Sequence, residues 1–124
     1  MIKRMGFIKA KAGLSREQFR HYYETAHAPL AARLFPMLKA YRRNYLNEVS
    51  RQPEGTAAFG YDAINEMCFA NAEDYRAFLE LAARPDIRAQ ILADEANFIE
   101  PNTLWGFVVE EAESSIDPRP FRGK

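Results

Sequence analysis

The sequence predicts an α+β fold in which two strand–helix–strand units share one antiparallel sheet. Two observations lead to this prediction: strand-like runs flank an amphipathic helix pattern in each half of the chain, and glycines and prolines cluster between the halves. The order of elements is that of a ferredoxin-like βαββαβ fold, with four strands and the helices on one face.

The first unit begins with a strand at residues 2–10. Ser15 and Gln18 form a capping box, which predicts that a helix starts there. Apolar side chains then recur at helical spacing on one face: Phe19, Tyr22, Tyr23, Ala26 and Leu30. Residues 39–48 follow as the second strand.

A loop at residues 49–60, which holds three glycine or proline residues, leads to the second unit. Its strand covers residues 62–70, and Asn71 is suited to cap the helix that follows. Pro85 ends that helix and starts another short one, because proline fits the first helical turn but not the interior. Residues 103–110 complete the sheet.

The chain of 124 residues predicts a single domain at residues 1–111, followed by a tail at 112–124. Hydrophobic residues make up 48% of the sequence, which is too apolar for a disordered chain. The tail contains Pro118 and Pro120 and has no periodicity. It either frays or lies along a partner subunit.

The charge and cysteine content of the sequence argue against several kinds of partner and location for this protein, beginning with nucleic acid. Basic and acidic residues number 17 each, so no strong field favours nucleic acid as a partner. The N-terminus lacks the apolar region of a signal peptide, and no apolar run is long enough to span a membrane. Cys68 is the only cysteine, which fits a reducing, cytoplasmic location. His21 and His27 lie on opposite sides of one helix and cannot chelate a metal together.

The four-stranded sheet leaves one face free of helices. Two strand faces are expected there, Tyr41/Arg43/Tyr45 and Trp105/Phe107/Val109. Such a patch is too apolar to remain in water, which predicts a homodimer whose sheets pack face to face around ligand-sized hollows.

His27 and Pro29 stand out within the first helix. The helical wheel places His27 at the margin of the apolar face, about 60° from its centre. Pro29 cannot donate a hydrogen bond to the carbonyl of Thr25, so a kink or restart is expected there. A freed carbonyl beside an imidazole is typical of a pocket wall. The alternative is a half-buried histidine that is hydrogen-bonded to a neighbour.

His27 and Pro29 also belong to a pattern that carries a family resemblance. The pattern consists of Phe19, Tyr22, Tyr23, His27 and Pro29. The sequence resembles the EthD-like branch of the dimeric α+β barrel superfamily over residues 2–110. The resemblance implies a dimer with a pocket between sheet and helices in each subunit. Some relatives are acid–base enzymes that act on lactones, quinones or polyketide rings, and others accompany oxidation pathways with no assigned reaction.

Muconolactone methylisomerases are similar from the second strand through the second helix. In them a first-helix histidine, a second-strand tyrosine and a third-strand cysteine line the pocket. Tyr41 matches the tyrosine, whereas His27 falls one position away in spacing. Met67 takes the cysteine position. Cys68 beside it should point to the opposite face and is not expected to inherit that role.

The leading hypothesis is therefore a cofactor-free isomerase, cyclase or dehydratase that moves a proton on a small cyclic carbonyl, lactone or phenol. His27 is the expected general acid or base, because an imidazole titrates near neutral pH, and Tyr41 is expected to hold the substrate oxygen. The expected substrate-binding residues are Tyr23, Arg43, Tyr45, Met67 and Trp105.

The alternative for several of these residues is a purely structural role. Tyr41, Tyr45 and Trp105 can simply pack, and Arg43 can form an ion pair with Asp62 or Glu66. A protein that binds a pathway intermediate without converting it is the second hypothesis, and a haem-linked oxidase is the third.

Overall fold

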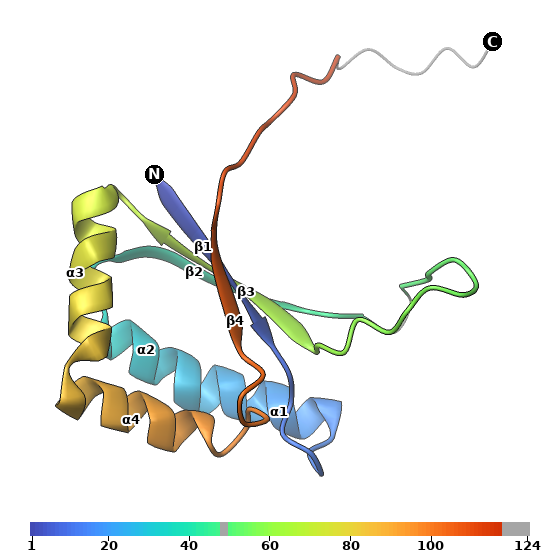
Figure 1. Cartoon of the computed structure of the whole chain (residues 1–124), viewed down its shortest axis with the longest axis horizontal. Coiled ribbons are helices and arrows are strands. Elements are labelled where there is room, and N and C mark those ends of the chain that lie inside the picture. The colour runs from blue at the N-terminus through green and yellow to red at the C-terminus, as the bar shows by residue number, and fades with distance from the viewer. Residues whose placement is uncertain (48–49, 118–124) are drawn as a thin grey trace.

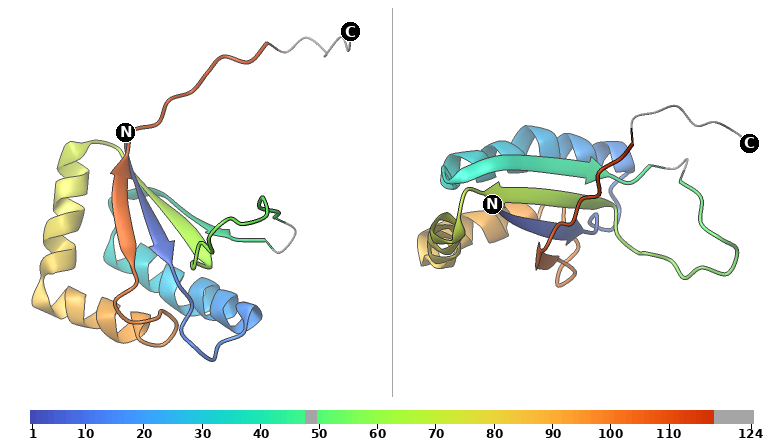
Figure 2. Two further views of the ribbon diagram at one scale, coloured as in Figure 1. Left: turned by 45° about the vertical axis from the view of Figure 1, so that its right-hand side comes forward. Right: turned by 90° about the horizontal axis from the view of Figure 1, so that it is seen from above.

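The computed structural model describes residues 1–47 and 50–117 and shows one four-stranded antiparallel sheet with its helices gathered on one side (Figures 1 and 2). The strand order is β2-β3-β1-β4, which confirms the predicted ferredoxin-like arrangement. The strands are β1 (Ile2–Ile8), β2 (Leu38–Tyr45), β3 (Ala63–Phe69) and β4 (Trp105–Val109). Each is slightly shorter than its predicted range, as strand ends often are.

The helices start where their capping residues predict. Both hydrogen bonds of the Ser15–Gln18 capping box are present, and Asn71 accepts a hydrogen bond from the N–H of Asp74 at 2.8 Å. Five helical segments result: α1 (Arg16–Tyr22), the π-helical turn η1 (Tyr23–His27), α2 (Ala28–Leu34), α3 (Ala72–Ala83) and α4 (Pro85–Glu95). No helix in the described ranges is long and apolar enough to cross a membrane.

The first helix does not break at Pro29, because a wider turn precedes it. In η1 the N–H of Ala28 bonds to the carbonyl of Tyr23, and Pro29 then falls in the first turn of α2, where its missing donor costs little. The wide turn holds one more residue than an α-turn, so it changes the direction of the side chain at its end, which is that of His27. His27, expected at the helix margin, is consequently buried with 7% of its surface exposed.

The core fills the space between helices and sheet as two apolar clusters. One joins the start of the first helix to the segment after α4, and its centre includes Phe19, Tyr23 and Phe98. The other joins α2, α3 and the C-terminal end of β3 around Phe35 and Phe69. Aromatic rings dominate both clusters, and Tyr41 packs against each of them.

The expectation that Tyr41, Arg43 and Tyr45 occupy the helix-free face is wrong. All three side chains point toward the first helix, where they hydrogen-bond Tyr23 or Glu24. Strand alternation shows which residues share a face but not which face is buried. Here the helix supplies a carboxylate and a phenol that the polar strand face can bind.

The prediction for β4 is confirmed, since Trp105 and Phe107 lie on the face without helices. Their rings stack at 5.8 Å, and Phe107 also contacts Phe7 of β1 at 5.9 Å. Trp105 is 57% exposed and Phe107 48% exposed. Together with Phe59 and Tyr61, these rings form a continuous aromatic patch on the bare face.

Two segments project from the body without regular structure, namely residues 50–60 and the start of the tail at 110–117 (Figure 1). Side chains throughout both segments are exposed. The predicted loop therefore matches the first segment. Pro118 and Pro120 lie outside the described residues, and the alternatives of a frayed tail and a tail along a partner remain predictions.

Candidate functional site

A hydrogen-bonded chain links the first helix to the C-terminal end of α4. Nδ1 of His27 lies 2.7 Å from Oδ2 of Asp94, and the hydroxyl of Tyr22 donates to Oδ1 of the same carboxylate at 2.6 Å. Asn97 in turn donates to the Tyr22 oxygen at 2.8 Å. An ionised carboxylate only accepts hydrogen bonds, so Nδ1 of His27 carries the hydrogen and the imidazole orientation is fixed.

The imidazole sits among aromatic rings. Its centre lies 4.9 Å from the Phe98 ring and 5.7 Å from the Tyr23 ring. Burial lowers the pKa of His27, and this effect outweighs the opposing influence of Asp94. His27 is therefore neutral near pH 7, with Nε2 as its free basic nitrogen.

Nε2 of His27 remains available to a ligand. Among the described residues, Nε2 has no hydrogen-bond partner. Every fully buried polar side-chain atom in the described part of the chain does have one, so Nε2 is not fully buried. Nε2 therefore retains some solvent contact. An imidazole held at Nδ1 and open at Nε2 is arranged as a general base is.

A second polar chain lies beside His27 and connects the helix to the sheet. The hydroxyls of Tyr23 and Tyr41 are 3.1 Å apart, and Nδ2 of Asn65 donates to the Tyr23 oxygen at 3.0 Å. Burial raises the pKa of both phenols, so both remain protonated donors at neutral pH. A Cβ atom at Gly6 would come within 2.6 Å of Oδ1 of Asn65, so the glycine makes room for this amide.

Arg43 is bound by Glu24 of η1 and not by the strand carboxylates. Its Nε and Nη2 donate to the two Glu24 oxygens at 2.8 and 2.9 Å, and the Tyr45 hydroxyl donates to the same carboxylate. This bidentate pairing lowers the pKa of Glu24 to about 2. The geometry is that of a structural ion pair between helix and sheet.

The two carboxylates proposed from the sequence as Arg43 partners are used elsewhere. Asp62 accepts a hydrogen bond from the N–H of Ala10 at 2.7 Å, and Glu66 pairs with Lys3 at 3.2 Å on the bare sheet face. Asp62 and Glu66 were suggested because they share a strand face, but Glu66 lies on the face opposite Arg43.

The structure brings together only some of the predicted site residues. His27, Tyr23 and Tyr41 are contiguous, and Met67 is paired with Tyr41 across the sheet, where it is 8% exposed. Trp105 does not join them, because it lies on the opposite face of the sheet.

Asp94 is not among the site residues that the sequence predicts. One signal was present. Asp94 stands in the last turn of α4, where the helix dipole disfavours a carboxylate. An acidic residue in that position needs a compensating partner, which here consists of His27 and the Tyr22 hydroxyl.

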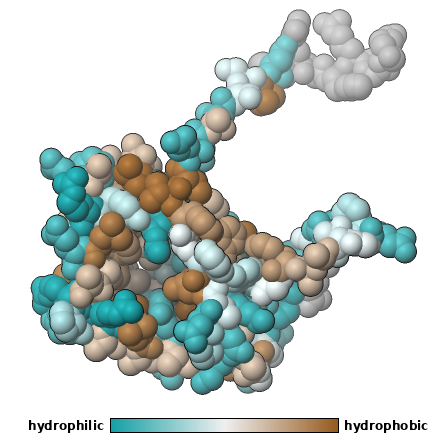
Figure 3. Space-filling view, in the orientation of Figure 1, coloured by the Kyte–Doolittle hydropathy of each residue, from teal (hydrophilic) through white to brown (hydrophobic). Residues whose placement is uncertain are grey.

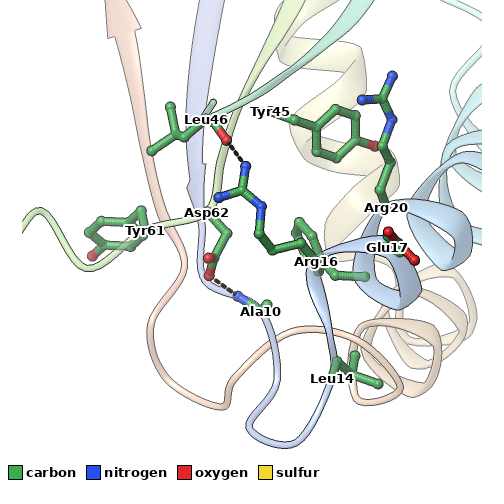
Figure 4. Close-up of a pocket in the computed structure, with 10 residues that line it drawn as sticks. Ala10, Leu14, Arg16, Glu17, Arg20, Tyr45, Leu46, Tyr61 and Asp62 are labelled. Carbon is green, nitrogen blue, oxygen red and sulfur yellow. Dashed lines mark hydrogen bonds between the residues drawn. The ribbon is translucent and has the colours of Figure 1, made fainter. Parts of the chain in front are cut away.

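A separate hollow of about 260 Å³ opens near the start of the first helix (Figure 4). The Arg20 guanidinium lies 4.6 Å over the Tyr45 ring there, and Arg16 donates to the carbonyl of Leu46. Neither His27 nor Asp94 lines this hollow. No cluster of three potential metal ligands occurs among residues 1–47 and 50–117.

Comparisons with known proteins agree with this architecture. The EthD domain model matches residues 11–102. An EthD family protein from Bacillus halodurans is similar in structure, with 19% identity, a TM-score of 0.60, and coverage of 90% of this chain and 100% of that one. No curated protein sequence matches the chain.

Two other solved structures share the fold. A hydroxynitrile lyase from Passiflora edulis has 17% identity and a TM-score of 0.57, with 91% of this chain and 96% of that chain covered. A dimeric ferredoxin-like protein of unknown function from Thermobifida fusca has 23% identity and a TM-score of 0.52, with 87% and 90% covered. Identities this low establish the shared fold alone.

Proposed function

The chain belongs to the EthD family, and on that premise we propose that it is a small, cofactor-free acid–base enzyme acting on a compact carbonyl, lactone or phenolic compound. The observation that carries the proposal is the His27–Asp94 pair, which fixes Nδ1 and leaves Nε2 open. Isomerisation, cyclisation and dehydration each need a well-placed proton acceptor or donor, and this pair supplies one.

In this proposal Nε2 of His27 takes a proton from the substrate and returns it at a second position. Asp94 holds the tautomer and stabilises the imidazolium that forms. The lowered pKa keeps His27 unprotonated at neutral pH, so the base is ready before substrate binds.

We assign stabilisation of the substrate oxygen to the neighbouring phenols. Tyr41 and Tyr23 are protonated and mutually hydrogen-bonded, and the Tyr23 ring contacts the imidazole. A substrate oxygen that carries developing negative charge can accept from this pair. The fold is compatible with such chemistry, since a hydroxynitrile lyase is built on it.

The proposal includes a homodimer formed through the bare sheet face. The exposed aromatic patch around Phe107 is its support, together with the dimeric ferredoxin-like protein that shares the fold. Burying these rings against a second copy would remove them from water.

The test is turnover of small lactones, quinones, phenols and a cyanohydrin by the wild type, His27→Gln and His21→Gln. His21 lies on the same helix but is exposed, so its variant controls for changes to the helix surface. We expect His27→Gln to lower kcat by roughly 100-fold or more, and His21→Gln to leave it unchanged. Equal turnover in the two variants would contradict an acid–base role for His27.

A ligand-binding role without catalysis is the second candidate, and the close packing of His27 among rings favours it. In that case one of the compounds binds and shifts the His27 NMR signals, but no member of the panel is converted.

A further inference from the structure

Two glycines lie side by side on neighbouring strands, at positions whose side chains would point toward the helices. Gly6 of β1 is paired directly with Gly106 of β4, and its other neighbour is Asn65 of β3. Neither glycine contributes a side chain to this row, and the space over them is taken by the side chains of Asn65 and Arg4. Figure 3 shows the surface hollowed between β4 and the helices α3 and α4. Val108, on the same side of β4, is 51% exposed, so the helices leave this part of the sheet uncovered.

Arg4 lies along this uncovered strip. A Cβ atom at Gly106 would overlap Nη2 of Arg4 and lie 2.7 Å from its Cζ, which places the guanidinium directly over the glycine. Arg4 is half-buried, and none of the described acidic side chains is within ion-pair distance of it. A partly buried guanidinium without a carboxylate is costly, and a bound anion would relieve that cost.

Glu95 stands in the last turn of α4, and its side chain is partly buried. Arg4 and Arg88 influence its carboxyl electrostatically, although Arg4 makes no ion pair with it. Burial has the larger effect and raises the pKa of Glu95. Glu95 follows Asp94, the residue that holds His27, so both acidic residues share the last turn of α4.

We propose that the Arg4 groove, formed by Arg4, Gly106, Val108 and Glu95, binds the carboxylate of a small, flat substrate. The planar guanidinium presents two parallel donors that match a carboxylate. The inference rests on the proposed function, because the bound carboxylate would orient the rest of the substrate toward His27.

The charges around the groove favour a carboxylate over a phosphate. A single arginine balances one negative charge, so the second charge of a dianion would have no cationic partner in the groove. When protonated, Glu95 can donate a second hydrogen bond to the bound carboxylate.

The test is titration of the full chain with benzoate and with its neutral isostere benzamide, monitored by NMR of the Arg4 Nε–H and the His27 ring. We expect benzoate to bind more tightly than benzamide. Arg4→Gln should weaken benzoate binding roughly tenfold or more, because it removes a charge-assisted bidentate contact. Arg33→Gln, which changes an exposed arginine on α2, is the matched control and should have no effect.

Gly106→Ala provides a second variant that keeps the arginine. The added methyl group meets only the flexible end of Arg4, so the fold should persist while the guanidinium is displaced. Benzoate affinity should fall in this variant as well. Equal binding of benzoate and benzamide, or a benzoate Kd within twofold of wild type in Arg4→Gln, would overturn the carboxylate site.

The outcomes separate this inference from the proposed function. Arg4-dependent benzoate binding, combined with turnover that survives His27→Gln, would leave the carboxylate site standing and remove the acid–base role. Turnover that depends on His27, combined with equal binding of benzoate and benzamide, would support the acid–base role and remove the carboxylate site.

Discussion

The carboxylate of Asp94 lies 2.7 Å from Nδ1 of His27, although 67 positions separate the two residues in the chain. The fold closes this distance by laying α4 beside the π turn that carries the histidine. The contact fixes which imidazole nitrogen is available, and the first two predictions depend on it.

Replacing Asp94 by Asn should impair catalysis while the protein stays folded. An amide in this position can present its NH₂ group to Nδ1, which favours the tautomer with hydrogen on Nε2 and removes the free base. We expect kcat to fall by about 100-fold, measured as a pH–rate profile alongside the ¹⁵N shifts of His27. Tyr22→Phe removes only one of the two contacts to Asp94 and should have a smaller effect. A wild-type pH–rate profile in Asp94→Asn would contradict this role.

His27 should titrate below its ordinary pKa of 6.5, because burial disfavours the charged imidazole. Exposed His21 is an internal reference in the same NMR titration. The unfolded chain then takes up a proton at higher pH than the native state does. The free energy of unfolding should therefore decrease as pH falls through 6.5 toward the native pKa of His27.

His27→Gln should remove that part of the pH dependence, which denaturant unfolding at pH 5 to 8 would measure. If the variant keeps the full slope across this window, then another group causes it.

Arg43→Gln should destabilise the protein by about 1–2 kcal/mol and change turnover little, because Arg43 is engaged by Glu24 and does not contact His27. Part of the Glu24 side chain is exposed, so the ion pair is worth less than a fully buried one. Arg42→Gln, on the other face of the same strand, is the control for strand propensity. A large loss of turnover at unchanged stability would instead indicate that Arg43 binds substrate.

The Glu24 pKa of about 2 predicts a separate acid effect. The native state keeps this carboxylate ionised to lower pH than the unfolded chain does. The stabilisation is therefore present above pH 4.5 and is lost as pH falls toward 2. Glu24→Gln should reduce stability at pH 6 and flatten the acid slope of the unfolding free energy.

Phe107→Glu should shift the protein toward a monomer if the bare sheet face forms the dimer. A charge among the exposed rings cannot be buried without a partner. Light scattering after size-exclusion chromatography measures the mass, and Leu79→Glu on exposed α3 is the control for added charge. An unchanged mass for wild type and Phe107→Glu would contradict dimerisation through this face.

The order of elements could be predicted from the sequence because its signals are local. The capping box at Ser15, the cap at Asn71 and the proline at position 85 each act within a few residues of the helix they start. The identity of the buried sheet face is not local. Tyr41 and Arg43 share a face by alternation, but the partner that buries it, Glu24, belongs to another element.

The candidate site shows the same division. His27 could be singled out because an imidazole and a proline share one helix. Asp94 could not be joined to it, since the contact depends on how α4 packs and on a π turn that the helical spacing does not reveal. Arg4 gave no signal in the sequence, because its position over Gly106 exists only once β1 and β4 pair.

The direction of the His27 imidazole depends on the number of residues in the π turn at Tyr23–His27. Deletion of one residue within it would let the helix continue in regular α geometry, and each residue step in such a helix turns a side chain by about 100°. His27 would then leave the Asp94 carboxylate while the flanking helices kept their caps and their apolar faces. A single codon lost within η1 is therefore expected to separate His27 from Asp94 without rebuilding the domain.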